Sequence, residues 1–527
     1  LLLLPSVNGI SSKHEILSKD PFQESEGKGN SHSHSSHSLD LMQSFLVLLS
    51  LPLQFTVQRS LSDVLRRSDR SRYFDTLTEI VHDEYKDKKQ ASDEIVTVQY
   101  QKREASITTV NERLQDILYE GDILVSPQFL ERVVDASLRR QGNRVKRQAF
   151  LDASYPMSIW TDGVPYVLHP SLSPSSRASV LRAISFWHNE TCINFRPRTN
   201  EVQYLNFVGN GDGCWSSVGR DTKSGPQPVS IGPGCSHFGV TSHELAHALG
   251  LFHEQSRYDR DSFVTLNSNR VPRRLLYNFA KIGDDELTTY SLPYDVGSVM
   301  HYAPTEFAID RRFPALTAVD PNLQFAMGNL YGPTFVDVAL LNVHYNCANR
   351  CRSSLNCANG GYIDSRSCGR CKCPSGFGGR LCDEVDVSFS QNCGGIVQVG
   401  EDVRRFTITI RQSGDTREKG CIYHFVAPQR RRILINVLEV NGTCVEGCHL
   451  DSAEFKMVAD LRPVGYRVCC NEQRGSRLVS VGNIVPSIFQ SSRKTYSVRF
   501  EYTLQAVRTK RNVDQSEIQD TIVDVEK

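Results

Sequence analysis

The pattern of apolar and polar residues differs between the two ends of this chain. Residues 61–86 place apolar side chains at helical spacing within a polar, charged stretch that holds no cysteine. Residues 406–410 (FTITI) and 433–437 (ILINV) are short, apolar-rich runs typical of β-strands. The pattern therefore predicts a partly helical region near the N-terminus and an all-β region over 393–504, with a charged, disordered tail at 505–527.

One apolar segment stands out near the N-terminus. Met42 is followed by an apolar-rich run (QSFLVLLSLPL) that is too short to cross a bilayer but typical of the apolar part of a signal peptide. We therefore expect a signal peptide at 42–58 and interpret residues 1–41, rich in serine and histidine, as a leader that is not native. No apolar run of 18 residues follows, so we expect a secreted protein without a membrane span.

The run HELAHALGLFH, which begins at His243, carries the clearest chemical signal. His243 and His247 are four residues apart, so a helix places both imidazoles on one face, where they can bind one metal ion. Gly250 can adopt a positive φ and turn the chain, which brings His253 round as a third ligand. Glu244 lies beside the site and can act as general base. The run predicts one catalytic Zn²⁺ per chain; surface histidines on a helix would not explain the glycine.

Composition narrows the class of protein. The formal net charge is only +1, which argues against nucleic acid or another polyanion as the main partner. The 16 cysteines are absent from the first 191 residues and dense after residue 340, and their spacings are not paired CxxC units. Such an even count predicts disulfides in an oxidising compartment rather than cytosolic zinc knuckles. At 527 residues the chain is long enough for three or four domains.

Further motifs accompany the histidine pattern. They are EQSRYDRD directly after His253, SVMHY at 298–302, and TCINF at 191–195. On these motifs the chain resembles the astacin family of zinc endopeptidases, which belongs to the metzincin class, over roughly residues 160–347. The resemblance implies a multidomain protein with an α+β catalytic domain at 148–347.

The resemblance also implies roles for residues around the metal. Met300 would form an apolar floor beneath the ligands. Tyr302 would be a further zinc ligand at rest and would swing to hydrogen-bond the oxyanion during catalysis. Glu254 would bind the ammonium group of the mature N-terminus through a buried ion pair. Cleavage after Arg147 would expose Gln148, which can cyclise and lose its charge, so this last pairing stays open.

A zymogen form is a further implication of the resemblance. Residues 59–147 would form a partly helical propeptide that ends at RVKR, a sequence typical of cleavage by subtilisin-like convertases after Arg147. Within it, YEGDI at 119–123 is similar to the family's inhibitory motif, so Asp122 would take the water position on zinc until processing. A solvated basic loop and an ordinary Gly-Asp turn are the simpler alternatives for these two motifs.

Two small modules are expected after the catalytic domain. The cysteine spacing and turn glycines of 348–383 are similar to those of EGF-like modules, which need disulfides because their core is negligible. The region 393–504 resembles a CUB domain, which is a β-sandwich. The disulfides that the resemblance implies are Cys192–Cys347, Cys214–Cys235, Cys351–Cys368, Cys357–Cys371, Cys373–Cys382 and Cys393–Cys421. The pairing stays open for Cys444, Cys448, Cys469 and Cys470.

The expected function is that of a secreted zinc endopeptidase that cleaves extracellular proteins. Matrix or cuticle substrates, in hatching or moulting, are suggested by analogy alone. The alternatives are a non-catalytic matrix-binding protein that uses its EGF-like and CUB modules, and a hydrolase of a non-peptide substrate. The first alternative predicts loss of the base or of a ligand, yet Glu244, the three histidines and Tyr302 are all present. Asn189 and Asn441 begin Asn-x-Thr triplets, which are possible N-glycosylation sites but are also frequent by chance.

Overall fold

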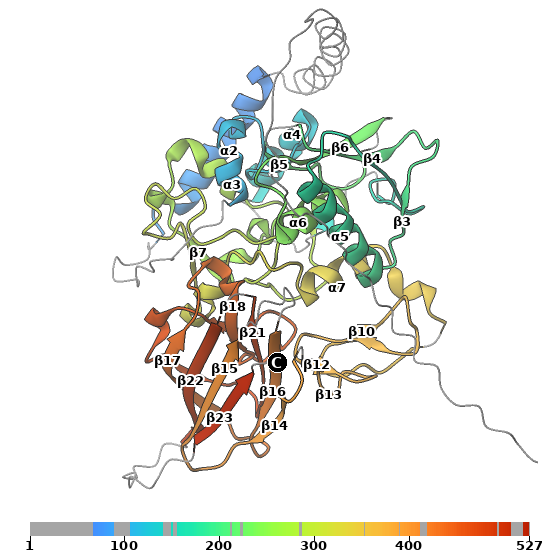
Figure 1. The fold of residues 1–527 in the computed structure, drawn as a ribbon. Helices are drawn as coiled ribbons and strands as arrows, with labels where there is room; N and C mark the ends of the chain where they lie inside the picture. Colours follow the sequence, from blue (N-terminus) through green and yellow to red (C-terminus); the bar gives the residue numbers. More distant parts are fainter. Residues whose placement is uncertain are drawn as a thin grey trace, which may run out of the picture. The chain divides into compact units, whose positions relative to one another are not determined.

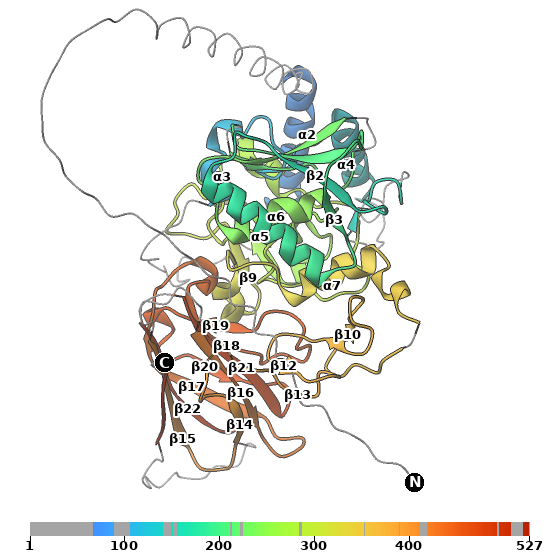
Figure 2. The ribbon, with the colours of Figure 1, turned by 45° about the vertical axis from the view of Figure 1, so that its right-hand side comes forward.

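The structure is a computed structural model, drawn in Figures 1 and 2. The residues it describes are 67–88, 106–140, 149–150, 155–210, 213–221, 225–283, 287–352, 354–388, 390–411, 419–492, 495–506 and 520–525. The expected leader, the signal peptide at 42–58 and the cleavage site at Arg147 lie outside these ranges. Among the helices of the described residues, none combines the length and the apolar character needed to cross a membrane.

A five-stranded sheet, with strand order β3-β2-β4-β6-β5, forms the centre of the expected catalytic domain of 148–347, which is called the catalytic region from here on. Four of its strands run parallel, and β5 pairs antiparallel with β6 at one edge. Two helices lie side by side against this sheet (Figure 2), and the Trp187 indole of the first donates to the Ser242 carbonyl of the second over 3.1 Å. The elements are β2 (Val164–Leu168), α5 (Pro174–Glu190), β3 (Phe195–Pro197), β4 (Tyr204–Val208), β5 (Cys214–Trp215), β6 (Pro226–Ile231) and α6 (Phe238–Ala248).

The second half of the catalytic region has little regular structure. Its longest helix, α7 (Phe335–His344), begins with a capping box in which Thr334 and Asp337 each bond the other's backbone N–H. Short strands pair as β1 with β8 and as β7 with β9. Their bounds are β1 (Ala149–Phe150), β7 (Val264–Leu266), β8 (Leu287–Thr288) and β9 (Leu316–Ala318).

The N-terminal region is partly helical, as the residue pattern predicts. Its helices are α2 (Arg67–Tyr85), α3 (Ile107–Val110) and α4 (Pro127–Arg140). The helix α2 packs on the catalytic region, where the rings of Phe74 and Tyr277 stack with centroids 4.2 Å apart. The Tyr85 hydroxyl is anchored there as well, because it donates to Asp261 over 2.5 Å and accepts from Arg260 over 3.1 Å.

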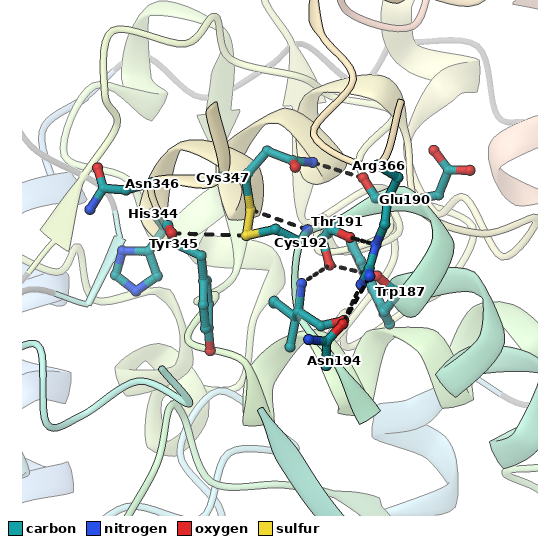
Figure 3. Close-up of a disulfide and its surroundings, with 12 residues drawn as sticks. Trp187, Glu190, Thr191, Cys192, Asn194, His344, Tyr345, Asn346, Cys347 and Arg366 are labelled. Carbon is teal, nitrogen blue, oxygen red and sulfur yellow. Dashed lines mark hydrogen bonds between the residues drawn. A yellow bond between two sulfur atoms is a disulfide. The ribbon is translucent and has the colours of Figure 1, made fainter. Parts of the chain in front are cut away.

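A small disulfide-rich region follows α7. It contains two two-stranded ribbons, β10 (Tyr362–Ile363) with β11 (Cys371–Lys372), and β12 (Phe377–Gly378) with β13 (Glu384–Val385). Its Arg366 reaches back to the catalytic region beside the Cys192–Cys347 disulfide, as Figure 3 shows. The guanidinium donates to the Thr191 carbonyl, the Ile193 carbonyl and the Asn194 side-chain oxygen over 2.7 to 2.8 Å.

The C-terminal region is a sandwich of two five-stranded sheets (Figure 1). Side chains alternate in burial along its strands, so that Phe406, Ile408 and Ile410 of β15 point into the shared core. The first sheet comprises β14 (Gly395–Gln398), β16 (Lys419–Val426), β21 (Ile484–Ser491), β18 (Asp451–Phe455) and β19 (Tyr466–Val468). The second comprises β20 (Arg477–Val479), β17 (Ile433–Asn441), β22 (Thr495–Leu504), β15 (Arg404–Arg411) and β23 (Asp520–Val525).

The prediction of a disordered tail is wrong for Asp520–Val525. This segment forms β23, which pairs parallel with β15 along residues 405–410. Its central residues Thr521, Ile522 and Val523 are β-branched and favour extended backbone. The charge of the tail, from which disorder was predicted, does not outweigh this preference. The sandwich therefore has one more edge strand than the boundary at residue 504 implies.

Every cysteine of the described residues is in a disulfide. Six bonds join the pairs that the family resemblance implies: Cys192–Cys347, Cys214–Cys235, Cys351–Cys368, Cys357–Cys371, Cys373–Cys382 and Cys393–Cys421. The pairs left open by the sequence are Cys444–Cys470 and Cys448–Cys469. These last two bonds lie side by side and tie one loop of the sandwich to one chain segment.

Candidate active site

The histidines of the predicted zinc site converge. His243 and His247 lie on one face of α6, which ends at Ala248, and Gly250 has a φ of +113°. A Cβ at Gly250 would meet the His344 ring at 3.1 Å, so a larger residue would be strained there in both backbone and packing. The turn brings His253 to the pair, with its Nε2 atom 3.3 Å from Nε2 of His243. All three imidazoles are buried.

Each imidazole is oriented through its other ring nitrogen. The Nδ1–H groups donate to the Val299 carbonyl from His243 and to the Leu251 carbonyl from His247, over 2.8 and 2.7 Å. The Nδ1–H of His253 donates instead to the carboxylate of Glu120 over 2.8 Å. Because each Nδ1 faces an acceptor, the three Nε2 lone pairs point toward one another. Such an arrangement requires a cation between them.

A carboxylate from the N-terminal region completes this cluster. Asp122 Oδ2 lies 3.2 Å from Nε2 of His243 and 3.3 Å from Nε2 of His253, and Oδ1 lies 3.6 Å from Nε2 of His247. The four potential ligand atoms all lie within 4.8 Å of one another and all four residues are buried. Three neutral imidazoles and one carboxylate form a donor set that suits Zn²⁺. The residues present therefore fit the metal that the sequence predicts.

A tight loop delivers Asp122 into the cluster. Tyr119 and Ile123 form an antiparallel bridge that closes the loop. Ser216 N donates to the Asp122 carbonyl over 3.1 Å, so the loop is also bonded to the residue that follows β5. Both Glu120 and Gly121 have positive φ, at 51° and 81°. A Cβ at Gly121 would approach the Phe307 ring to 3.0 Å, which explains the glycine of YEGD.

Glu244 borders the cluster without joining it. Its carboxylate is fully buried, and both oxygens lack a hydrogen-bond partner among the described residues. Burial, and then the nearby charge of Asp122, raise the pKa of Glu244 well above its usual value. A buried carboxyl without a partner beside a metal-type cluster is a strained arrangement that a structural role does not explain.

Known proteins resemble this chain over most of its length. The family model of the astacin peptidases matches residues 152–346. The zinc metalloproteinase nas-29 of Caenorhabditis elegans is 47% identical over 501 residues, covering 91% of this chain and 94% of that protein. The nas-23 zinc metalloproteinase of the same organism is 43% identical over 406 residues, covering 77% and 75%. The chain belongs to the astacin family.

A solved structure is also similar. It is high choriolytic enzyme 1, a hatching enzyme zinc-protease from the medaka Oryzias latipes, with 34% identity and a TM-score of 0.34. The match covers 37% of this chain and 98% of that one. With the family established by the relatives above, the chain is a zinc metalloendopeptidase, and Zn²⁺ is its cofactor.

The turn at 298–302 packs against the histidine cluster, since its Val299 carbonyl accepts from His243 Nδ1 over 2.8 Å. Met300 is buried in the same apolar core as α6, and its carbonyl accepts from Glu254 N over 2.9 Å. The Tyr302 ring lies 5.0 Å from the His253 ring, and its hydroxyl donates to the Glu120 carbonyl over 2.6 Å. Tyr302 is thus beside the cluster but engaged by the N-terminal region.

Glu254 has a partner that the sequence analysis did not consider. Its carboxylate is buried and accepts from Arg257 Nη1 over 2.9 Å and from Asp295 N over 2.8 Å. Burial raises the pKa of Glu254 to about 7, against the lowering effect of the Arg257 guanidinium. Gln148 lies outside the described residues. In this form of the chain the counter-charge of Glu254 is Arg257, and the Glu-x-x-Arg spacing was the signal that could have shown it.

Two further groups escaped the sequence analysis. Glu120, which orients His253, has nothing in its local sequence to mark it, because its role depends on a positive φ that few residues other than glycine adopt. Val445, Glu446 and His449 of the sandwich border the cavity beside the cluster, which no local motif could reveal. The triplet residues Asn189 and Asn441 are exposed.

Proposed function

We propose that the chain is a secreted zinc endopeptidase that is made as a latent zymogen and cleaves extracellular proteins, including those of matrix or cuticle. Residues 42–58 would direct secretion, and a subtilisin-like convertase would remove the propeptide of 59–147 by cleavage after Arg147. An EGF-like module at 348–383 and a CUB domain would follow the catalytic domain of 148–347. The eight disulfides support an oxidising, extracellular location.

The observation that carries the proposal is the position of Asp122 among the three imidazoles. A carboxylate from the N-terminal region occupies the direction from which water and substrate must approach His243, His247 and His253, the residues that would hold zinc. The same region engages the Tyr302 hydroxyl through the Glu120 carbonyl. The N-terminal region thus blocks the access to the metal position and also occupies the Tyr302 hydroxyl, so its removal would activate the enzyme.

In the processed enzyme, Glu244 would act as the general base. When bound, Zn²⁺ supplies a Lewis acid that polarises the peptide carbonyl and increases the acidity of water. The Glu244 carboxylate would accept the proton of the attacking water at an oxygen that has no other partner, and would pass it to the leaving amine.

Tyr302 would stabilise the oxyanion. Its hydroxyl is a donor that the Glu120 carbonyl accepts in the latent chain, so processing frees that donor for the substrate. The ring is buried beside His253, which limits its movement to a short swing within the site. The neighbouring Met300 would keep an apolar floor beneath the ligands.

Hydrolysis of casein by the processed full-length protein tests the proposal. We expect processed wild type to cleave casein, a zinc chelator to stop the reaction, and zinc to restore it. The unprocessed chain should be silent. A processed wild type that binds zinc but cleaves neither casein nor matrix protein would favour the alternative, a non-catalytic matrix-binding protein.

A further inference from the structure

One loop of the C-terminal sandwich is held unusually firmly. Residues 444–449 lie between two neighbouring disulfides, Cys444–Cys470 and Cys448–Cys469, all four of whose cysteines are buried. The Gly447 carbonyl accepts from Arg467 Nη1 over 2.8 Å, and Gly447 has a φ of +70°. We call residues 444–449 the cystine loop. The two disulfides restrict the conformations that this loop can adopt.

The cystine loop lies directly on the catalytic region. The Thr305 hydroxyl, just beyond Tyr302, donates to Glu446 Oε1 over 2.6 Å. Gly447 and Gly328 approach so closely that a Cβ at Gly447 would stand 2.4 Å from the Gly328 carbonyl oxygen. The backbone contact leaves no room for the two regions to slide past each other here.

Contacts continue on both sides of the loop. Val464 N of the sandwich donates to Asp295 Oδ1 over 3.1 Å, and the Tyr466 hydroxyl donates to Asp320 Oδ2 over 2.6 Å. Apolar residues cross the boundary as well, because Val464 belongs to a catalytic core while Leu323 packs against the sandwich core. The sandwich is therefore attached to the catalytic region by a packed interface next to the active site.

A cavity of about 70 Å³ adjoins the histidine cluster and is shared by three regions. The catalytic region supplies His243, His253 and Tyr302, and the cystine loop supplies Val445, Glu446 and His449. The N-terminal region also lines it, through residues 106–108 and Asp122, which the proposed processing removes. The space that opens on processing thus has one wall from the catalytic region and one from the sandwich.

Two carboxylates from outside the N-terminal region, Glu306 and Glu446, line this space. In the latent chain the Ser106 hydroxyl donates to Glu306 Oε2 over 3.2 Å, and the Thr108 hydroxyl donates to the same oxygen. Glu306 is 5% exposed while residues 106–108 cover it, and their removal takes away these two hydroxyl donors. A substrate that enters the cleft is expected to replace them with donors of its own.

We propose that the cystine loop forms a wall of the substrate cleft, and that Glu446, together with Glu306, selects a lysine or arginine side chain of the protein substrate near the scissile bond. This inference rests on the proposed function, since it requires a processed peptidase. Opposite charge in a partly buried cleft favours a long cationic side chain, and hydroxyl donors in the latent chain hold the place of its ammonium or guanidinium group. Glu446 is thus a specificity-determining residue from outside the catalytic domain.

The test uses processed full-length enzyme and peptides that carry one lysine, or norleucine in its place, at each of several positions around the scissile bond. We expect wild type to prefer lysine at one position. Glu446→Gln should lower the lysine-to-norleucine ratio of kcat/KM about tenfold there, as expected for loss of a charged hydrogen-bond acceptor. Glu446→Lys should reverse the preference toward glutamate. Any chelator-sensitive casein cleavage by a variant, at whatever rate, shows that it has folded.

Glu472→Gln is the matched control, because Glu472 is an exposed residue beside Cys470 that does not line the cavity. The lysine-to-norleucine ratio of kcat/KM for Glu472→Gln should equal that of wild type. Equal ratios in wild type and both Glu446 variants, with casein cleavage retained, would overturn the inference alone. Absence of chelator-sensitive casein cleavage in wild type would instead overturn the proposed function, and the inference with it.

Discussion

The three imidazoles of the active site are held by two different regions of the chain. His243 and His247 donate their Nδ1–H groups to carbonyls of the catalytic region, Val299 and Leu251, whereas His253 donates to Glu120 of the N-terminal region. Removal of the N-terminal region therefore leaves two imidazoles with their partners and deprives the third of its acceptor. The contacts of the N-terminal region would therefore serve latency, and those within the catalytic region would serve catalysis. A substitution in one set should change one property and leave the other.

The largest effect is expected on the catalytic side of this comparison. Glu244→Gln should reduce kcat/KM of the processed enzyme about 100- to 10,000-fold, because a general base is lost while the shape of its side chain is kept. Zinc content should stay at one ion per chain. The measurement is peptide hydrolysis with zinc analysis on the same sample. Activity within a few-fold of wild type would remove Glu244 from the mechanism.

Tyr302→Phe should have the next largest effect. Loss of one oxyanion donor lowers kcat by roughly 100- to 1,000-fold, with little change in KM or in thermal stability. Tyr290→Phe is the control, since Tyr290 hydrogen-bonds His344 over 2.9 Å and does not line the active-site cavity. A Tyr302→Phe enzyme with wild-type kcat would show that its hydroxyl serves only the latent form, through Glu120.

Glu120→Gln tests the N-terminal side. A neutral amide is a weaker acceptor for the His253 Nδ1–H than a carboxylate, so it should hold the inhibited arrangement less firmly. The residual peptidase activity of the unprocessed chain should therefore rise about tenfold. The processed enzyme, which lacks residue 120, should be unchanged. Hydrolysis of a short peptide by chains with Arg147→Ala, which would block the proposed cleavage, measures the effect. Glu112→Gln, an exposed substitution in the same region, is the control. No change in the unprocessed chain would mean that His253 does not depend on Glu120.

The smallest effect concerns stability alone. Asp295 is buried, and burial followed by the charge of Asp337 raises its pKa from about 3.8 to about 6. The folded chain therefore binds this proton more tightly than the unfolded chain, and the free energy of unfolding should fall as pH rises from about 4 to about 6. The loss is on the order of 3 kcal/mol at most. Asp295→Asn should reduce this slope in denaturant unfolding, and Asp402→Asn, which is exposed, should not.

The parts of the site that lie close in sequence could be predicted. Helical periodicity and one glycine sufficed to bring His243, His247 and His253 together, because i, i+4 geometry and a positive φ are local properties. The loop of Asp122 required knowledge of a family motif, since its 121-residue separation from His243 is set by tertiary packing. Short apolar-rich runs likewise predicted the β-strands of the sandwich, but the pairing of β23 with β15 could not be seen from either strand alone.

Contacts between regions were beyond the sequence. Glu120 as the acceptor of His253 and Glu446 beside the cavity each depend on where separate elements meet. Glu120 carries its carboxylate into a buried position, where an unpaired group is costly, so a partner must exist even though no local pattern indicates it. Once the fold is known, each buried charged side chain therefore indicates that a hydrogen-bonding or oppositely charged partner lies beside it.

Visible absorption of the cobalt-substituted, unprocessed chain tests the central claim, that Asp122 keeps the enzyme latent by joining the three histidines at the metal. Cobalt(II) replaces zinc in such sites and reports changes in its ligands. In an Arg147→Ala chain, Asp122→Ala is predicted to change the cobalt spectrum toward that of processed enzyme, whereas Glu112→Ala leaves it as in the parent. An identical spectrum with and without the Asp122 carboxylate would contradict the account.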